Sequence, residues 1–386
     1  MKTALKKANL PLYFVLYYVI SAYYSIVNRI SYDNEATKGL HGPAIVLSTH
    51  PNYFDFIHVA MALYPRRITI MANRMYCDSK SLSSLLRSLC VIPKRLFYAD
   101  AESIHKLYAA VKSNHIVVMM PEGRLSSCGS NFPVARGTAR LIKRLRVPVY
   151  RCNANGAYFV RPKWSPISRA GNIRLETKKI LDANDIEAMS ESEIELALSE
   201  AMSYENDCLG NLRVCKDRTL GLDGLLFVCP ECGKEFTLTT KDNHVHCDSC
   251  GFDAVMQKDC TFDRGDFKHL REWYAFQQDY IDQQANNLKL SAKVRVSVCL
   301  DKLTEAGEGV MSLDCEGFRF NGKLFGEDTD FFIPAADLAG MPFDCGKSVE
   351  TYHNDLLYFF YPVENPRQCV KWSMLVDSLE KTRRKS

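Results

Sequence analysis

The sequence has little excess charge of either sign: 49 lysines and arginines stand against 45 aspartates and glutamates, for a formal net charge of +4 over 386 residues. Proteins that bind nucleic acid through their surface usually show a stronger, clustered basic bias, so this composition argues against nucleic acid as a partner. Internal repeats and low-complexity tracts are also lacking. Because hydrophobic residues make up 47% and charged residues 24%, we exclude a largely disordered or collagen-like chain. The length of 386 residues predicts two or three globular domains.

Long hydrophobic runs are scarce as well, which excludes a membrane protein with many spanning helices. The exception is an uncharged run from Ala8 to Asn28, preceded by three lysines and rich in tyrosine and phenylalanine. Its length is marginal for a spanning helix, and its aromatic rings suit the headgroup level of a bilayer. We therefore expect residues 1–30 to form a membrane-associating helix, spanning or interfacial, at the cytoplasmic face. The alternatives are a buried core helix and a cleaved signal peptide, for which Ser21–Tyr23 is a poor cleavage site.

The fifteen cysteines do not follow the pattern of a disulfide framework. Eleven are scattered singly from Cys77 to Cys369, which indicates reduced thiols in a cytoplasmic setting. The other four form two Cys-x-x-Cys pairs, each followed by glycine, with fourteen residues between the pairs. This spacing is typical of a closed, structural zinc site, with rubredoxin-like iron as the alternative. We predict a zinc ribbon over residues 221–256, with the ligands Cys229, Cys232, Cys247 and Cys250.

Apolar strands alternate with amphipathic helices over residues 31–215, a pattern that predicts an α/β domain with a mainly parallel, mixed sheet flanked by helices. Strands are expected at 44–47, 68–71 and 116–120 and from 147 onward, and helices at 55–63, 79–89, 101–113, 134–145 and from about 190 to 204. Ser190 and Glu193 form a capping box at the start of the last helix.

The C-terminal part of the sequence has a different pattern. An amphipathic helix at 267–284 is expected within a linking segment, residues 257–289. Alternating segments such as 294–300 and 356–361, followed by a helix at 372–379, predict a small β-rich domain over residues 290–386. Its outline resembles a pleckstrin-homology-like or related small β domain, an analogy of fold that carries no function.

Two candidate site residues follow the first apolar strand. Pro51 disfavours a helical conformation at His50, so this residue stays extended at the end of the strand. Asp55, five residues later, falls near the first turn of the next helix, where its carboxylate can reach the imidazole and fix its tautomer. Alternatively, Asp55 only complements the helix dipole and His50 is an ordinary loop residue.

A polar cluster at the end of the strand at 116–120 is the second candidate. Glu122, Gly123 and Arg124 lie where α/β sheets place ligand contacts. Gly123 allows close approach of the backbone to a ligand, and Arg124 is suited to bind a phosphate through two nitrogens. A polar turn that merely ends the strand is the alternative.

Together these segments resemble the glycerolipid acyltransferases of the lysophosphatidic-acid acyltransferase type. The His-x4-Asp box of that family matches His50 and Asp55, and its Pro-Glu-Gly box matches 121–123. The family's phosphate-binding region resembles 89–95, and its fourth box resembles 147–149. All four boxes occur in the family's order, and the resemblance covers roughly residues 35–210.

The resemblance implies a function and a role for each site residue. His50, held by Asp55, would act as general base on a lipid hydroxyl that attacks the thioester of acyl-CoA or acyl carrier protein. Arg124 and Arg95 would hold the acceptor phosphate, and Glu122 and Gly123 would shape that pocket. The acceptor would be a lysophospholipid at the membrane surface, lysophosphatidic acid first.

Two alternatives remain open from the sequence. The third box reads Glu-Gly-Arg-Leu-Ser, which looks more like acyltransferases that reacylate lysophosphatidylethanolamine. The alternative of another class is a catalytically silent, membrane-tethered binding protein that uses the zinc ribbon.

Overall fold

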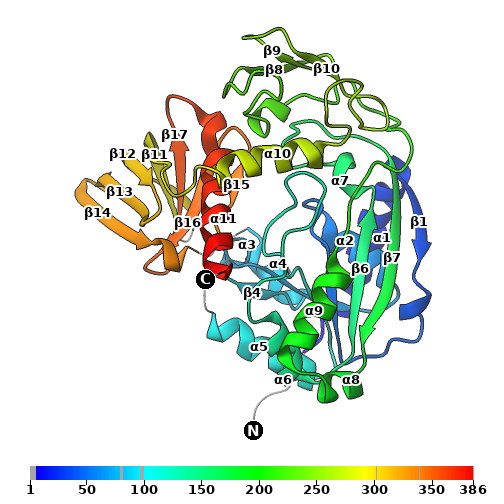
Figure 1. Ribbon diagram of the computed structural model, residues 1–386. Coiled ribbons are helices and arrows are strands. Elements are labelled where there is room, and N and C mark those ends of the chain that lie inside the picture. Colours follow the sequence, from blue (N-terminus) through cyan, green and yellow to red (C-terminus); the bar gives the residue numbers. More distant parts are fainter. Residues whose placement is uncertain (1–5, 79–80, 96–99, 301, 339, 386) are drawn as a thin grey trace. The chain divides into compact units, whose positions relative to one another are not determined.

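The computed structural model describes residues 6–78, 81–95, 100–300, 302–338 and 340–385. The chain divides into two compact units (Figure 1). The first unit consists of Met1–Pro162 and Ser168–Cys215, and the second of Lys163–Ile167 and Lys216–Ser386. The finer division of the second unit into ribbon, linking helix and β-rich domain stays a prediction.

The first unit is built on a seven-stranded sheet in the order β1-β7-β6-β2-β5-β3-β4. Neighbouring strands are parallel except for the antiparallel pair β6 and β7, which confirms the mainly parallel sheet. The strands are β1 (Arg29–Asp33), β2 (Ala44–Ser48), β3 (Ile68–Asn73), β4 (Ile92–Lys94), β5 (Ile116–Met119), β6 (Val149–Asn155) and β7 (Asn172–Leu181).

Helices cover both faces of this sheet, because the central strand β2 is apolar on both sides. Ala44 and Val46 join one core cluster, while Ile45 and Leu47, which point to the opposite face, join another. The first cluster includes residues of α1 and α2, and the second includes residues of α5, α6 and α9. The helices are α1 (Leu10–Val27), α2 (Asp55–Leu63), α3 (Arg74–Asp78), α4 (Ser83–Ser88), α5 (Ala101–Lys112), α6 (Thr138–Leu145), α7 (Ala157–Val160), α8 (Ala183–Ala188) and α9 (Glu191–Met202), with a 3-10 turn η1 (Glu35–Thr37).

Some helix boundaries differ from the predicted ones. The helix expected over 134–145 begins at Thr138, because Gly137, the N-cap residue, has a φ of 83°, which is outside the right-handed helical region. The helix expected over 79–89 is α4, and residues 79–80 lie outside the described residues. The capping box at α9 is confirmed, since the Ser190 hydroxyl accepts from the Glu193 amide and the Glu193 carboxylate accepts from the Ser190 amide.

The second unit contains two sheets. The small antiparallel sheet has the order β10-β9-β8 and follows a 3-10 turn η2 (Leu222–Gly224). Its strands are β8 (Leu238–Lys241), β9 (His244–Cys247) and β10 (Asp253–Val255). The helix α10 (Leu270–Asp282) holds the preceding loop, because the Trp273 indole donates to the Val228 carbonyl and the Gln277 side chain accepts from the Phe227 and Val228 amides.

The larger sheet of the second unit is antiparallel, with seven strands in the order β14-β13-β12-β11-β17-β16-β15. It consists of two meanders followed by α11 (Cys369–Lys385), and Trp372 of that helix packs against Phe318. This confirms a β-rich C-terminal part closed by a helix. The remaining elements are β11 (Leu290–Cys299), β12 (Leu303–Leu313), β13 (Gly317–Leu324), β14 (Glu327–Pro334), η3 (Ala335–Asp337), β15 (Phe343–Asp344), β16 (Ser348–His353), β17 (Leu356–Pro362) and η4 (Pro366–Gln368).

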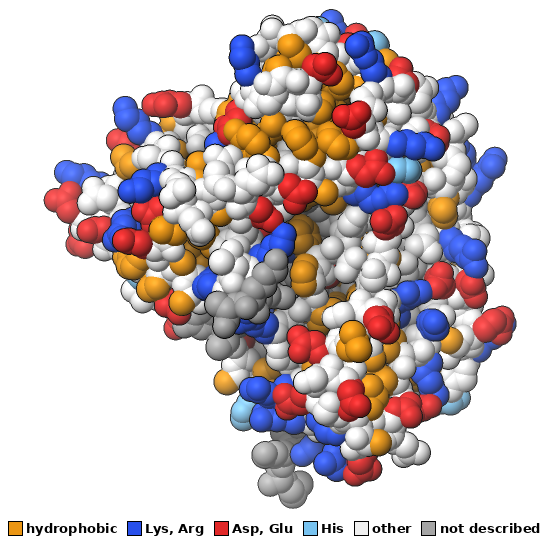
Figure 2. Space-filling view, in the orientation of Figure 1, with side chains coloured by type: hydrophobic (Ala, Val, Ile, Leu, Met, Phe, Trp, Pro, Cys, Tyr) orange, Lys and Arg blue, Asp and Glu red, His pale blue; other side chains and the backbone are white. Residues whose placement is uncertain are grey.

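The distribution of charged side chains on the surface agrees with the small net charge of the sequence. On the face drawn in Figure 2, acidic and basic side chains are interspersed over both units instead of gathering by sign. A continuous basic stripe, as expected for a phosphate-backbone footprint, is not present among the described residues on that face.

Candidate active site and metal-binding group

The candidate active site lies at the carboxyl end of the parallel strands of the first unit. His50 follows β2, and Glu122 follows β5, the neighbour of β2 in the sheet. The carboxyl ends of parallel strands meet at one sheet edge, which is where open α/β sheets bind ligands. The sheet therefore brings together two residues that are 72 positions apart in the chain.

His50 and Asp55 form a hydrogen-bonded pair. Asp55 is the first residue of α2, and its Oδ2 lies 2.6 Å from His50 Nδ1. The carboxylate is buried (2% exposed) and also accepts from the Asn52 backbone amide at 3.3 Å, while the imidazole is 25% exposed. A carboxylate on Nδ1 selects the tautomer protonated there and leaves Nε2 as the basic nitrogen. The geometry is that of an imidazole prepared to accept a proton.

Glu122 connects the His50 segment to the loop that follows β5. Its Oε1 accepts from the His50 backbone amide at 3.3 Å, and its Oε2 accepts from the Phe132 backbone amide at 2.8 Å. Burial raises the pKa of this carboxyl group to about 7, although the Phe132 amide and His50 oppose the rise. Glu122 thus fixes two backbone segments at the site instead of facing solvent.

The rest of the Glu-Gly-Arg cluster lies close to the same segment. Gly123 has a φ of 72°, a backbone conformation that favours glycine. The guanidinium carbon of Arg124 is 3.6 Å from the centroid of the Phe132 ring, an attractive cation–π arrangement. Since the Phe132 amide binds Glu122, this contact places Arg124 beside the Glu122 loop. The Ser126 amide in turn donates to the His50 carbonyl at 2.9 Å.

Arg95 lies at the same sheet edge but farther from the pair. It follows β4, which is separated from β2 by β5 and β3. With about 4.8 Å between neighbouring strands, its backbone is roughly 14 Å from that of β2. The Arg95 backbone amide donates to the Asp100 carboxylate at 3.0 Å. The structure therefore brings His50, Asp55, Glu122 and the Arg124 loop together, and it places Arg95 three strands away.

Two polar residues of the site were not singled out from the sequence. His58 lies three residues after Asp55 on α2, so the i, i+3 spacing was the available signal. Asn52 braces the site from within the His-x4-Asp box, because its side-chain amide donates to the Ala157 carbonyl at 2.7 Å and its Oδ1 accepts from the Phe54 amide. Only the contact to Phe54 is local enough to be foreseen.

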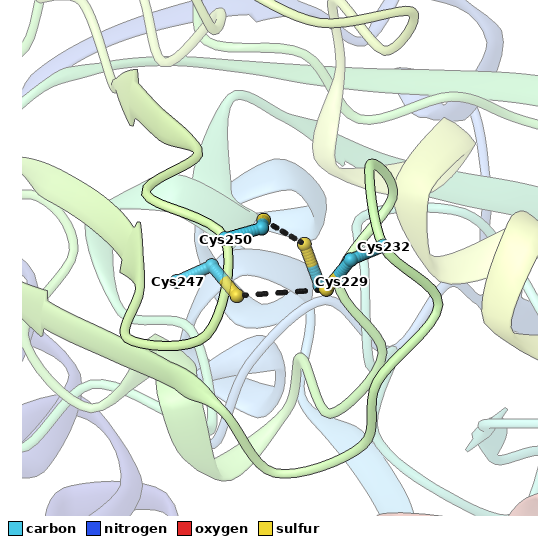
Figure 3. A group of neighbouring side chains, drawn as sticks. All are labelled: Cys229, Cys232, Cys247 and Cys250. Carbon is cyan, nitrogen blue, oxygen red and sulfur yellow. Dashed lines mark hydrogen bonds between the residues drawn. The ribbon is translucent and has the colours of Figure 1, made fainter.

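The second unit holds a compact group of four cysteines (Figure 3). The Sγ atoms lie within 4.8 Å of one another, with 3.7 Å between Cys229 and Cys250 and 3.9 Å between Cys232 and Cys247. These separations are too long for disulfides, whose sulfurs are about 2.05 Å apart. They fit the edge of a tetrahedron around a metal with bonds of about 2.3 Å, which is roughly 3.8 Å. The group is compatible with a metal site.

Comparison with known proteins shows what part of the first unit is similar to. Residues 29–154 match the model of the Acyltransferase family. The crystal structure of the 1-acyl-sn-glycerophosphate (LPA) acyltransferase PlsC from Thermotoga maritima superposes with a TM-score of 0.43 over 50% of this chain and 76% of that chain, at 16% identity. A search of curated proteins found no significant match. The family match confirms, over residues 29–154, the resemblance to acyltransferases that was noted from the sequence boxes.

Proposed function

We propose that this protein is a membrane-associated O-acyltransferase that transfers a fatty acyl group from acyl-CoA or acyl carrier protein to the free hydroxyl of a lysoglycerophospholipid. Lysophosphatidic acid is the first candidate acceptor. The observation that carries the proposal is the 2.6 Å contact between His50 Nδ1 and the buried Asp55 carboxylate, inside a segment that matches the Acyltransferase family. The partly exposed imidazole is accessible to a substrate hydroxyl.

The proposed reaction follows from this tautomer. His50 Nε2 takes the proton of the acceptor hydroxyl while its oxygen forms a bond to the thioester carbonyl carbon. Asp55 stabilises the imidazolium that results. When the carbon–sulfur bond breaks, the departing thiolate receives the proton from His50, so the enzyme returns to its starting state without a covalent acyl intermediate.

The proposed acceptor carries a phosphate group, because the candidate site has an arginine that could bind one. Arg124 follows Glu122 and Gly123 in the loop whose Glu122 carboxylate binds the His50 amide, and a guanidinium binds phosphate through two nitrogens. Arg95, three strands away, would contact a more distant part of the substrates. Lysophosphatidylethanolamine is the alternative acceptor, because the third box, Glu-Gly-Arg-Leu-Ser, favours that class.

The helix α1 is proposed to hold the protein at the cytoplasmic face of a membrane. By length and composition it is apolar enough to cross one, with a mean hydropathy of 1.5 over 18 residues. One face of the helix carries the buried side chains of Tyr13 and Tyr24, whereas Val19 (64% exposed) and Ile26 (81% exposed) lie on the opposite face. An inward face packed on protein and an outward apolar face favour a position in the interface.

The four-cysteine group is proposed to bind a structural zinc ion. Four thiolates fill a tetrahedral zinc shell and leave no open position for a substrate. Backbone amides of Glu231 and Cys232 hydrogen-bond to the Cys229 sulfur, which suits a thiolate ligand. The metal would supply folding energy to a segment with a small core of its own.

The decisive experiment compares His50→Ala with the wild type in membranes supplied with labelled acyl-CoA. We expect the variant to lose acyl transfer by at least about 10²-fold, the low end of what a general base contributes. His105→Ala, an exposed histidine on α5, is the matched control and should keep wild-type activity. A panel of lysophospholipids names the acceptor. If wild type and His50→Ala are equally inactive on every acceptor, the silent binding protein is the better description.

A further inference from the structure

A second histidine contacts the carboxylate that holds His50. His58 lies three residues after Asp55 on α2, so both side chains project from one face of the helix. Its Nδ1 is 3.5 Å from Asp55 Oδ1, while Oδ2 of the same carboxylate is 2.6 Å from His50 Nδ1. The His58 side chain is fully buried (0% exposed), so water is excluded from its ring. The carboxylate therefore lies between two imidazoles.

The other nitrogen of the His58 ring meets the N-terminal helix. Tyr24, a buried residue of α1, has its hydroxyl oxygen 2.9 Å from His58 Nε2, with 5.1 Å between the ring centroids. The Tyr24 hydroxyl can donate to Nε2 or accept from it, so the direction of this bond depends on which His58 nitrogen carries the proton.

These contacts determine which His58 nitrogen carries the proton. A carboxylate accepts only, so a lone pair on Nδ1 would face the lone pairs of Asp55 Oδ1 at 3.5 Å. The favoured tautomer has the proton on Nδ1, directed at Asp55, and Nε2 accepts from the Tyr24 hydroxyl. Within the described part of the chain, Nδ1 has no hydrogen bond of ordinary geometry, so the Asp55 carboxylate is the acceptor that the structure offers it.

We propose that His58 and Tyr24 are positioning residues for acyl transfer. Together they form an arm from α1 that orients the second oxygen of Asp55 and, through it, the His50 imidazole. The inference rests on the proposed function and adds to it that the N-terminal helix completes the active site. Neither residue touches the reacting atoms, and both act through Asp55.

Two substitutions at His58 separate the two ends of the arm. The amide nitrogen of asparagine takes the place of Nδ1, so His58→Asn keeps a donor toward Asp55 and loses the bond to Tyr24. Glutamine places its amide at the position of Nε2, so His58→Gln keeps the contact to Tyr24 and loses the donor toward Asp55. We expect kcat to fall about tenfold in His58→Gln, which loses the donor toward a carboxylate. In His58→Asn, which loses the bond to a hydroxyl, kcat should fall about threefold or less. Both losses are within the range of one hydrogen bond. KM should stay unchanged, because substrate contacts are retained.

Tyr24→Phe removes only the hydroxyl and keeps the ring in its packing. We expect kcat to fall about threefold or less, as in His58→Asn, because both substitutions remove the same hydrogen bond. Because Tyr24 acts through His58, the same substitution should cause no further loss in a His58→Asn background. If Tyr24 only packs, the two losses multiply in the double variant.

The outcomes distinguish this inference from the proposed function. Wild-type kcat in both His58→Gln and Tyr24→Phe, with His50→Ala inactive, overturns the arm and leaves the acyltransferase assignment in place. Multiplying losses in Tyr24→Phe/His58→Asn also overturn the arm. A wild type that transfers no acyl group overturns both. Circular dichroism and thermal melts of each variant identify any that do not fold, and Tyr24→Phe remains the test where His58→Gln does not.

Discussion

The four-cysteine group and the His50–Asp55 pair are built in opposite ways. All four cysteines come from a short stretch in which the same loop occurs twice: the Gly233 amide donates to the Cys229 carbonyl at 3.0 Å, and the Gly251 amide donates to the Cys247 carbonyl at 3.0 Å. Both glycines have a positive φ, 68° and 77°, which explains their place in the motif. The candidate active site instead gathers side chains from α1, α2 and the loops after β2 and β5. A local spacing suffices for the first kind of site, whereas the second depends on sheet order.

Removal of the metal should have the largest effect, since structural zinc contributes on the order of 10 kcal/mol to folding of small metal-binding segments. In the double variant Cys232→Ser/Cys250→Ser, two of four thiolates are gone, so we expect bound zinc to fall from about one ion per chain to none and trypsin to cleave within residues 229–251. Metal analysis by mass spectrometry and limited proteolysis measure the two effects.

The control for that experiment is Cys315→Ser, which alters an exposed thiol outside the group and should keep both the metal and the proteolysis pattern. Full metal content in the double variant would show that these cysteines are not the ligands. Iron in place of zinc would keep the site and change the assigned metal.

The buried Glu122 carboxyl group belongs to the candidate active site. Its ionisation should have the next largest effect on the free energy of unfolding. Burial raises its pKa to about 7, so between pH 4.5 and 7 the folded protein holds a proton that the unfolded chain has released. The free energy of unfolding therefore falls as the pH rises through this window, by roughly 3 kcal/mol from this group. Glu122→Gln, which is neutral at every pH, should lose that part of the dependence.

Urea unfolding of wild type and Glu122→Gln at pH 5 and pH 8 checks the expectation. The free energy of unfolding of Glu122→Gln minus that of the wild type should be larger at pH 8 than at pH 5. Glu195→Gln on the exposed side of α9 is the matched control and should follow the wild type. A pH dependence that is the same in Glu122→Gln and in the wild type would contradict a raised pKa.

Most of the central sheet was predictable because its strands are apolar on both faces. The strands β1, β4 and β7 were missed. The strand β1 is a short and mostly exposed edge strand that pairs with β7 far along the chain. The strand β7 offered a usable signal, because Ile173, Leu175 and Thr177 alternate with more exposed residues. Edge strands depend on partners that the local sequence does not specify.

In the candidate active site, too, local contacts could be predicted from the sequence, and contacts between distant segments could not. A histidine before proline and an aspartate five residues later allowed a contact between His50 and Asp55 to be predicted as one of two alternatives, and the structure has this contact at 2.6 Å. That Glu122 would bind the His50 amide required the knowledge that β2 and β5 are neighbours. The contact between Tyr24 and His58 was beyond the sequence pattern, because it depends on the docking of α1 against α2.

The outward face of α1 gives the smallest expected effect and tests whether one helix serves both the site and the bilayer. Val19→Ser and Ile26→Ser each remove an exposed apolar side chain, so each should weaken binding to vesicles of phosphatidylcholine and phosphatidylglycerol by about fivefold, equivalent to roughly 1 kcal/mol. Folding stability should change by less than about 0.5 kcal/mol, because neither side chain is buried in the protein. Vesicle cosedimentation and urea unfolding measure the two quantities.

The control is Leu196→Ser, which alters an exposed apolar residue on α9 and should leave vesicle binding unchanged. If it weakens binding as much as the α1 variants do, or if the α1 variants bind like the wild type, the outward face of α1 is not the membrane contact, and Tyr24 would then connect the active site to a helix that only packs on the domain.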